Sequence, residues 1–374
     1  MRLWTGVFSQ INRDATAYFE QALAALGHLP ETRETVETAV DLRFDLRTSL
    51  FPLGLLSRVL GYLEEAESLA TTLDDRRRIS RVSVYMSHLL QVTGRLNEAR
   101  RFAESARTIA EALGDFPARI GATFYIGASC YFAGDYSCGR EFLRETVQLL
   151  KGGGARERYG LAGFPAVMAR AYLAWLYADR GEFAAALAHG YDGVRLGEAV
   201  DHPYSLIIAC WGPAYLHTGR RELSQALPLS ERALALARDW DLPIHTSTAM
   251  GFLGHIYALS GRIADGLALL EDAVRLHESV GFAYYHSLIV AYLAEAYLLA
   301  GRLDDARACG DKALKLARER GERGFEAWCL RSLGEIAAHA DPPDLEPAME
   351  RYDQALAGPR NWGCGHSSPT ATLV

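Results

Sequence analysis

Apolar and polar residues alternate along this chain with the spacing of amphipathic helices, and short turns separate the helical stretches. One phrase marks these turns repeatedly: an apolar stretch ends at a glycine, and a small residue follows five positions later. The phrase reads GYLEEA, GRLNEA, GDYSCG, GEFAAA, GRIADG and GRLDDA, starting at Gly61, Gly94, Gly134, Gly181, Gly261 and Gly301. A glycine after a helix supplies the left-handed conformation that a tight turn needs. The pattern therefore predicts pairs of helices joined by short turns.

The residues around each turn keep a common register with a period of about 40 residues. Gly219 opens a variant turn, GRRELSQA, in which the small residue is delayed to Ala226, and a last turn is expected near Asp341. A small residue also lies seven positions before each turn, at Ser87, Gly127, Ala174, Gly212, Gly254 and Ala294. Two helices approach closely only where both lack bulk, so we expect each pair to cross at these positions.

This register predicts an all-α fold, namely an α-solenoid that forms a right-handed superhelix of about eight antiparallel helix pairs. Residues 1–79 fit the register less well, and we expect an irregular helical cap there, followed by a repeat array over residues 80–357. The glycine-rich stretch 151–165 interrupts the array as its longest loop, either a solvated connection or a hinge or binding loop. Residues 358–374 are rich in Gly, Ser and Pro, which predicts a disordered tail.

The positions that define the register resemble the tetratricopeptide repeat. A small residue, a tyrosine three positions later and a small residue in the second helix recur in that family; the tyrosines here are Tyr177, Tyr215, Tyr257 and Tyr297. The period of about 40 residues exceeds the 34 of the family, which implies longer helices or loops.

A second resemblance covers most of the chain and is carried by three segments, Tyr18–Arg47, Gly197–Leu206 and Arg318–Glu346. They are similar to the C-terminal repeat region of a bacterial family that joins a class III adenylate cyclase domain and a P-loop ATPase to tetratricopeptide repeats. The resemblance implies a regulatory or partner-sensing arm.

Composition narrows the classes of partner. The net charge of −7 argues against a nucleic-acid or anionic-membrane partner, because such partners require a basic surface. No apolar run is long enough for a membrane span, and the first residues lack the apolar core of a signal peptide, so we expect a cytoplasmic protein. The six cysteines form no CxxC pair, and we expect free thiols, with Cys130 and Cys138 as ordinary packing residues.

Motifs for chemistry are missing from the sequence. It contains no GxxxxGK[ST] phosphate loop, no HExxH or cysteine and histidine cluster with metal-ligand spacing, and no GxSxG elbow. We therefore expect no enzyme activity, no cofactor and no metal, and predict an interaction scaffold for a protein or peptide. The alternative is part of an adenylate cyclase/ATPase signalling enzyme whose catalytic domains lie outside this chain.

The tetratricopeptide resemblance also implies where a partner would bind. In such arrays the first helix of each pair lines a concave groove, and the residue after the small position, with those three and four further on, points inward. Transferred to this sequence, these positions are His88, Gln91, Tyr131, Phe132, Trp175, Asp179, Leu216, His217, His255, Glu295, Arg331, Glu335 and His339. Exposed aromatic residues in a groove anchor peptides. Alternatively, residues such as Phe132 and Leu216 pack between repeats, and the histidines are solvated or hydrogen-bonded.

Overall fold

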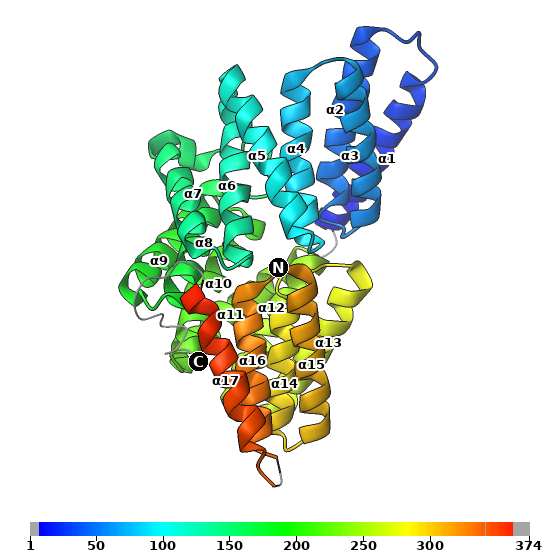
Figure 1. Cartoon of the computed structure of the whole chain (residues 1–374). Coiled ribbons are helices and arrows are strands. Elements are labelled where there is room, and N and C mark those ends of the chain that lie inside the picture. Colours follow the sequence, from blue (N-terminus) through cyan, green and yellow to red (C-terminus); the bar gives the residue numbers. More distant parts are fainter. Residues whose placement is uncertain (1–6, 341, 362–374) are drawn as a thin grey trace.

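The computed structural model describes residues 7–340 and 342–361, and within these ranges the chain is helical with no strand. The all-α prediction is confirmed (Figure 1). The helices are α1 (Val7–Leu26), α2 (Arg33–Leu50), α3 (Leu56–Thr72), α4 (Arg76–Val92), α5 (Leu96–Leu113), α6 (Phe116–Phe132), α7 (Tyr136–Leu149), the 3-10 helix η1 (Gly152–Arg156), α8 (Pro165–Asp179), α9 (Phe183–Ala199), α10 (Pro203–Gly219), α11 (Leu223–Asp239), α12 (Pro243–Leu259), α13 (Ile263–Val280), α14 (His286–Leu299), α15 (Leu303–Arg320), α16 (Arg323–Ala338) and α17 (Leu345–Asn361).

Consecutive helices form eight pairs, from α2 with α3 to α16 with α17, and α1 precedes them. The prediction of about eight pairs is confirmed for the described residues. The first helices of successive pairs also pack on one another, from α4 to α16. These inner helices are buried around almost their whole circumference, whereas the second helices bury only one stripe. The two helices of a pair therefore have different roles, one inside the solenoid and one outside.

Most turns within the pairs have the predicted geometry, with a glycine in the left-handed conformation. Gly134 adopts φ 76°, and the Asp135 N–H donates to the carbonyl of Cys130 at 2.8 Å, a bond that closes the end of α6. Two turn predictions are wrong. Gly61 lies inside α3, and Gly219 is the last residue of α10, where Arg221 takes the left-handed conformation instead, at φ 60°.

The helices cross at small residues, as the register predicts. A Cβ built on Gly266 of α13 would lie 2.6 Å from the carbonyl oxygen of Gly254 in α12 and 2.7 Å from the backbone nitrogen of Ala258. Neither backbone atom has room to move, so this crossing requires the missing side chains.

Two details of the predicted domain division change. The stretch 151–165 contains the 3-10 helix, so the loop is not wholly irregular. Helix α17 continues to Asn361, four positions past the expected end of the array at residue 357. The rest of the predicted tail, residues 362–374, and Asp341 lie outside the described residues. The boundary between cap and array at residue 79 stays a prediction.

The solenoid curves until distant repeats meet. Helix α16 contacts α6, and the Ala283 N–H, between α13 and α14, donates to the carbonyl of Val92 at the end of α4 at 2.8 Å. Figure 1 places the N-terminal helices α1–α7 directly above the C-terminal helices α12–α17. The inner helices therefore enclose an interior. No described helix is both long and apolar enough to cross a membrane.

Replacement of glycine by alanine should have opposite effects on stability at a crowded and at an open position. We expect Gly266→Ala to lower the free energy of unfolding by about 1–3 kcal/mol, because the new Cβ meets backbone atoms. Gly61→Ala is the matched control, since nothing lies within 4 Å of its Cβ position inside α3. That change should stabilise the chain by about 0.5–1 kcal/mol through helix propensity. Urea unfolding followed by circular dichroism measures both, and destabilisation by Gly61→Ala would contradict this view of the crossings.

Candidate functional site

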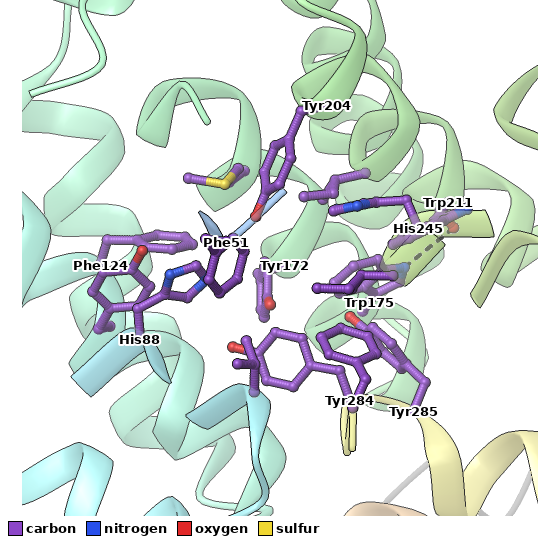
Figure 2. A pocket seen from close by; sticks show the side chains of 16 residues that line it. Phe51, His88, Phe124, Tyr172, Trp175, Tyr204, Trp211, His245, Tyr284 and Tyr285 are labelled. Carbon is purple, nitrogen blue, oxygen red and sulfur yellow. Dashed lines mark hydrogen bonds between the residues drawn. The ribbon is translucent and has the colours of Figure 1, made fainter. Parts of the chain in front are cut away.

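The interior of the solenoid contains a small cavity lined mainly by aromatic side chains (Figure 2). Its free volume is about 30 Å³, which accommodates a water molecule or two and no amino-acid side chain. The lining comes from the inner helices α4, α6, α8, α10 and α12, the end of α2, and the segment between α13 and α14. It includes Phe51, His88, Tyr172, Trp175, Tyr204, Trp211, His245 and Tyr284.

Most of the predicted groove residues are buried and are not exposed in an open groove, and two of them, His88 and Trp175, line this cavity. Trp175 is only 1% exposed, because the superhelix closes and its inward positions face one another. Glu335 and His339 remain partly or largely exposed at the end of α16. The buried positions are His88, Gln91, Tyr131, Phe132, Trp175, Asp179, Leu216, His217, His255, Glu295 and Arg331. Whether they bind a partner stays a prediction.

His88 of α4 is held in a defined protonation state. The Arg47 guanidinium donates to its Nδ1 at 2.9 Å, and because arginine has no acceptor, His88 must be neutral there. Burial, reinforced by the charge of Arg47, lowers the pKa of His88 well below its usual value. The ring packs against Phe51 and Tyr125 at centroid distances of 4.5 and 5.0 Å. His88 is thus a hydrogen-bonded interior residue.

Gln91, one turn further along α4, links three parts of the chain. Its Nε2 donates to Ser129 Oγ of α6 at 3.1 Å, and its Oε1 accepts a hydrogen bond from the Tyr284 hydroxyl. A buried amide with both ends satisfied fixes how these segments meet.

Tyr131, Phe132 and Trp175 form the aromatic wall of the interior on α6 and α8. Tyr131 lies 6.1 Å from Trp175 between ring centroids, and Phe132 stacks on Tyr284 at 4.7 Å. The Trp175 Nε1–H donates to the carbonyl of Trp211 at 3.1 Å (Figure 2). The predicted inward residues therefore meet, although through packing and not in an open groove.

Asp179, at the end of α8, is a buried carboxyl group surrounded by hydroxyl donors. Tyr215 donates to it at 2.7 Å and Tyr136 at 3.3 Å, and Trp328 Nε1 donates to the Tyr215 oxygen at 3.2 Å. Burial raises the pKa of Asp179 to about 6 against the opposing effect of these hydrogen bonds. The chain of bonds joins α8, α10 and α16.

His255, Glu295 and Arg331 form a second buried polar group, on α12, α14 and α16. Glu295 accepts from His255 Nε2 at 2.8 Å, from Arg331, and from Ser332 Oγ at 2.9 Å. Burial opposes ionisation of Glu295, but the charge of Arg331 and the hydrogen bond from His255 outweigh it and lower its pKa to about 2. His255 stacks on Tyr292 at 3.7 Å, and burial lowers its pKa, so the neutral ring donates to the carboxylate.

His217 lies apart from these groups. Its Nδ1 is 2.7 Å from Glu222, and its Nε2 is 3.0 Å from the Tyr191 hydroxyl on the outer helix α9. The inward position predicted for it is therefore wrong.

The site residues expected from the sequence do not include those between α13 and α14. Phe282, Tyr284 and Tyr285 line the interior cavity although they belong to a connection between repeats. Three aromatic residues within four positions of an inter-helix connection were the available signal.

A larger hollow of about 1070 Å³ opens between α2, α4, the start of α6 and the loop after η1. Most of its charged lining residues are paired with one another: Arg78 lies 2.7 Å from Asp41 and 2.6 Å from Asp75, and Arg77 lies 3.5 Å from Asp115. The loop contributes Glu157, Tyr159 and Gly160 to this hollow. A binding role for the loop stays a prediction.

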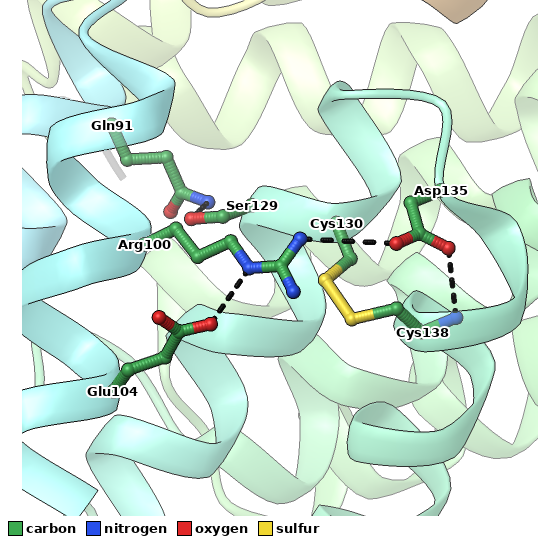
Figure 3. Close-up of a disulfide and its surroundings, with 7 residues drawn as sticks. All are labelled: Gln91, Arg100, Glu104, Ser129, Cys130, Asp135 and Cys138. Carbon is green, nitrogen blue, oxygen red and sulfur yellow. Dashed lines mark hydrogen bonds and ion pairs between the residues drawn. A yellow bond between two sulfur atoms is a disulfide. The ribbon is translucent and has the colours of Figure 1, made fainter.

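Cys130 and Cys138 form a disulfide across the turn between α6 and α7, so the expectation of free thiols is wrong for this pair (Figure 3). The tight turn brings residues eight positions apart together, with Cα atoms 5.8 Å apart. A carboxylate oxygen of Asp135 lies within 4.8 Å of both sulfurs, which makes these three the group among the described residues that could hold a metal ion. While the sulfurs are bonded to each other, they are not available as thiolate ligands.

Comparisons with known proteins agree on the fold. Residues 286–361, which span α14–α17, match the family model described as Tetratricopeptide repeat. No curated protein gives a significant match to the sequence. Together with the helix pairs, the match identifies the fold as an all-α solenoid of the tetratricopeptide type.

Solved structures resemble the whole chain. A Rap protein complexed with Competence and Sporulation Factor has a TM-score of 0.70 at 16% identity, over 96% of this chain and 98% of that chain. The Rap conjugation gene regulator of the plasmid pLS20, in complex with the Phr* peptide, has a TM-score of 0.62 at 12% identity, over 96% and 99%. A signal transduction ATPase with numerous domains from Pyrococcus horikoshii, which carries a tetratricopeptide repeat sensor, has a TM-score of 0.51 at 14% identity, over 90% and 51%. At these identities the similarity concerns the fold alone.

The raised pKa of Asp179 predicts a pH-dependent effect of Asp179→Asn. Folding favours the protonated acid, so the wild type loses stability as the pH rises from about 4 through about 6, by up to about 3 kcal/mol. The amide does not titrate, so the variant should gain stability relative to the wild type over that interval. Urea unfolding between about pH 4 and pH 8 measures the difference. Exposed Asp304→Asn is the control, and a flat difference for Asp179→Asn would contradict the assignment.

The disulfide predicts a response to reductant. A bond between residues eight positions apart restricts the unfolded chain and contributes about 2–3 kcal/mol. We expect a thiol reductant to lower the thermal midpoint of the wild type and to leave that of Cys138→Ser unchanged. The described free cysteines, Cys210, Cys309 and Cys329, are present in both proteins and serve as the internal control. Equal midpoints of the wild type with and without reductant would show that the bond does not form.

Proposed function

We propose that this chain is a non-catalytic interaction scaffold that binds a protein or peptide segment at the interior of its superhelix. The observation that carries the proposal is the convergence of inward residues from the inner helices on one aromatic interior that retains unfilled space. Aromatic side chains supply much contact area at little cost in conformational entropy, which suits them to hold a peptide.

The comparisons support this proposal at the level of the fold. Two proteins of the same fold and length were solved with a bound partner, one with Competence and Sporulation Factor and the other with the Phr* peptide. A scaffold of this size and curvature thus accommodates such a ligand elsewhere. We place the protein in the cytoplasm and expect no nucleic-acid partner, given its net charge of −7.

Binding can be tested with peptides selected from a random library on the purified chain. We expect Trp175→Phe to lower the affinity for the selected peptides at least tenfold. The change removes contact area and a hydrogen-bond donor inside the interior but keeps an aromatic side chain there. Trp240→Phe is the matched control, since Trp240 is 39% exposed at the end of the outer helix α11. Calorimetric affinities that are equal for both variants and the wild type would locate the ligand outside the interior.

A second candidate is the sensing arm of a cyclase or ATPase signalling protein. The resemblance suggested by three segments of the sequence motivates it, and the fold shared with about half of the Pyrococcus horikoshii ATPase, which carries a tetratricopeptide repeat sensor, is compatible with it. The DNA that flanks the coding sequence tests it. Adjacent cyclase or ATPase sequence in the same reading frame would support the arm, and unrelated flanking genes would remove it.

A further inference from the structure

The segment Phe282–Tyr285 lies in the interior in the way that a bound peptide would. It connects α13 to α14, yet it contacts the end of α4, far away in the sequence. The Ala283 N–H donates to the carbonyl of Val92 at 2.8 Å, and the Tyr284 hydroxyl donates to Gln91 Oε1, 193 positions away in the sequence. One backbone bond and one side-chain bond therefore dock this segment on the end of α4.

Its two tyrosines occupy aromatic sites made by different helices. The Tyr284 ring stacks on Phe132 of α6, with centroids 4.7 Å apart. The Tyr285 ring meets Trp175 of α8 and Phe252 of α12 edge-on, at 5.4 Å in each case. Figure 2 shows both tyrosines below Tyr172 and Trp175 at the edge of the cavity. The segment thus fills the space that a ligand of the interior would need.

Displacing this segment from the cavity should also cost less free energy than displacing any other part of the lining. Most of the lining residues belong to buried helices, whereas Phe282–Tyr285 belong to a connection. Tyr285 adopts φ 58°, a left-handed conformation that is unfavourable for an aromatic residue and persists here through the surrounding contacts. Connections open more readily than packed helices. The remaining volume of about 30 Å³ admits no peptide unless part of the lining moves.

We infer that the ligand of the interior is an extended peptide with two neighbouring aromatic residues, at least one of them tyrosine, and that it binds by displacing Phe282–Tyr285. This inference rests on the proposed function. The ligand donates a backbone N–H to the Val92 carbonyl and a phenol hydroxyl to Gln91, and it stacks an aromatic ring on Phe132. In the free chain the segment makes these contacts itself, so it competes with the ligand for them.

The segment's own sequence is the probe for this inference. A labelled synthetic peptide VGFAYYHS, which corresponds to residues 280–287, is titrated into the full chain, and VGFAAAHS is the control peptide. Three variants are compared with the wild type. Tyr284→Ala empties one aromatic site, and Tyr284→Phe removes only the bond to Gln91. Tyr297→Phe is the matched control, because it removes a hydroxyl that donates to Glu271 at 2.8 Å outside the cavity lining.

We expect VGFAYYHS to bind Tyr284→Phe about fivefold more tightly than the wild type, since one internal hydrogen bond no longer competes. Tyr284→Ala should bind it at least tenfold more tightly, Tyr297→Phe should equal the wild type, and VGFAAAHS should bind none of them. Hydrogen exchange provides a second readout in the wild type. The amide of Ala283 should be protected in the free chain and should exchange faster when the peptide is bound.

Equal affinity of VGFAYYHS for the wild type and both folded Tyr284 variants would overturn the inference, as would no binding to either variant. Circular dichroism establishes whether each variant folds. If Tyr284→Ala does not fold, Tyr284→Phe, which retains the aromatic ring, still provides the test. The inference can also fail while the proposed function holds. If library peptides bind in a manner sensitive to Trp175→Phe while the Ala283 amide stays protected, the interior binds ligands but Phe282–Tyr285 is a permanent part of the core.

Discussion

The interior of this superhelix has to be filled, because the inner helices from α4 to α16 are apolar on the face that points inward as well as on the faces between neighbours. An open solenoid would expose that surface to water, at a cost of about 25 cal/mol per Å² of apolar area. The chain avoids this cost by curving until α16 meets α6 and by inserting Phe282–Tyr285 between them and α4. Repeat proteins ordinarily depend on contacts between neighbouring repeats. Here contacts between repeats far apart in the chain add to them.

Polar groups inside this core determine how neighbouring and distant repeats align. Glu295 accepts hydrogen bonds from residues of both α12 and α16. Asp179 accepts a hydrogen bond from the Tyr215 hydroxyl, which in turn accepts one from Trp328 of α16. A buried ion pair such as that of Arg331 and Glu295 gains little over apolar packing but is costly to break. An interior of this kind tolerates few alternative registers, because a shifted helix would leave a buried carboxylate without donors.

A filled interior changes what binding requires. A ligand of an open groove adds its contacts to a surface that water already covers, whereas a ligand of this interior must exchange with groups already in place. Its affinity is then the difference between two sets of contacts, reduced by the fraction of chains in which the interior is open. The same arrangement favours selectivity, since only a segment that reproduces the aromatic stacking on Phe132 and the bond to Val92 replaces the internal one.

The sequence by itself determined the helix pairs, their turns and their crossings, because these depend on local residues. Gly134 and Gly266 could be assigned from spacing alone, since a left-handed turn and a close approach each require a glycine wherever the neighbours lie. The positions expected to point inward, such as Trp175 and Glu295, follow from the resemblance to the tetratricopeptide repeat. Only the tertiary structure decided that these residues are buried, that Cys130 bonds to Cys138, and that Tyr284 reaches Gln91. These outcomes depend on the small rotation added at every repeat, which accumulates over the whole superhelix and leaves no local pattern in the sequence.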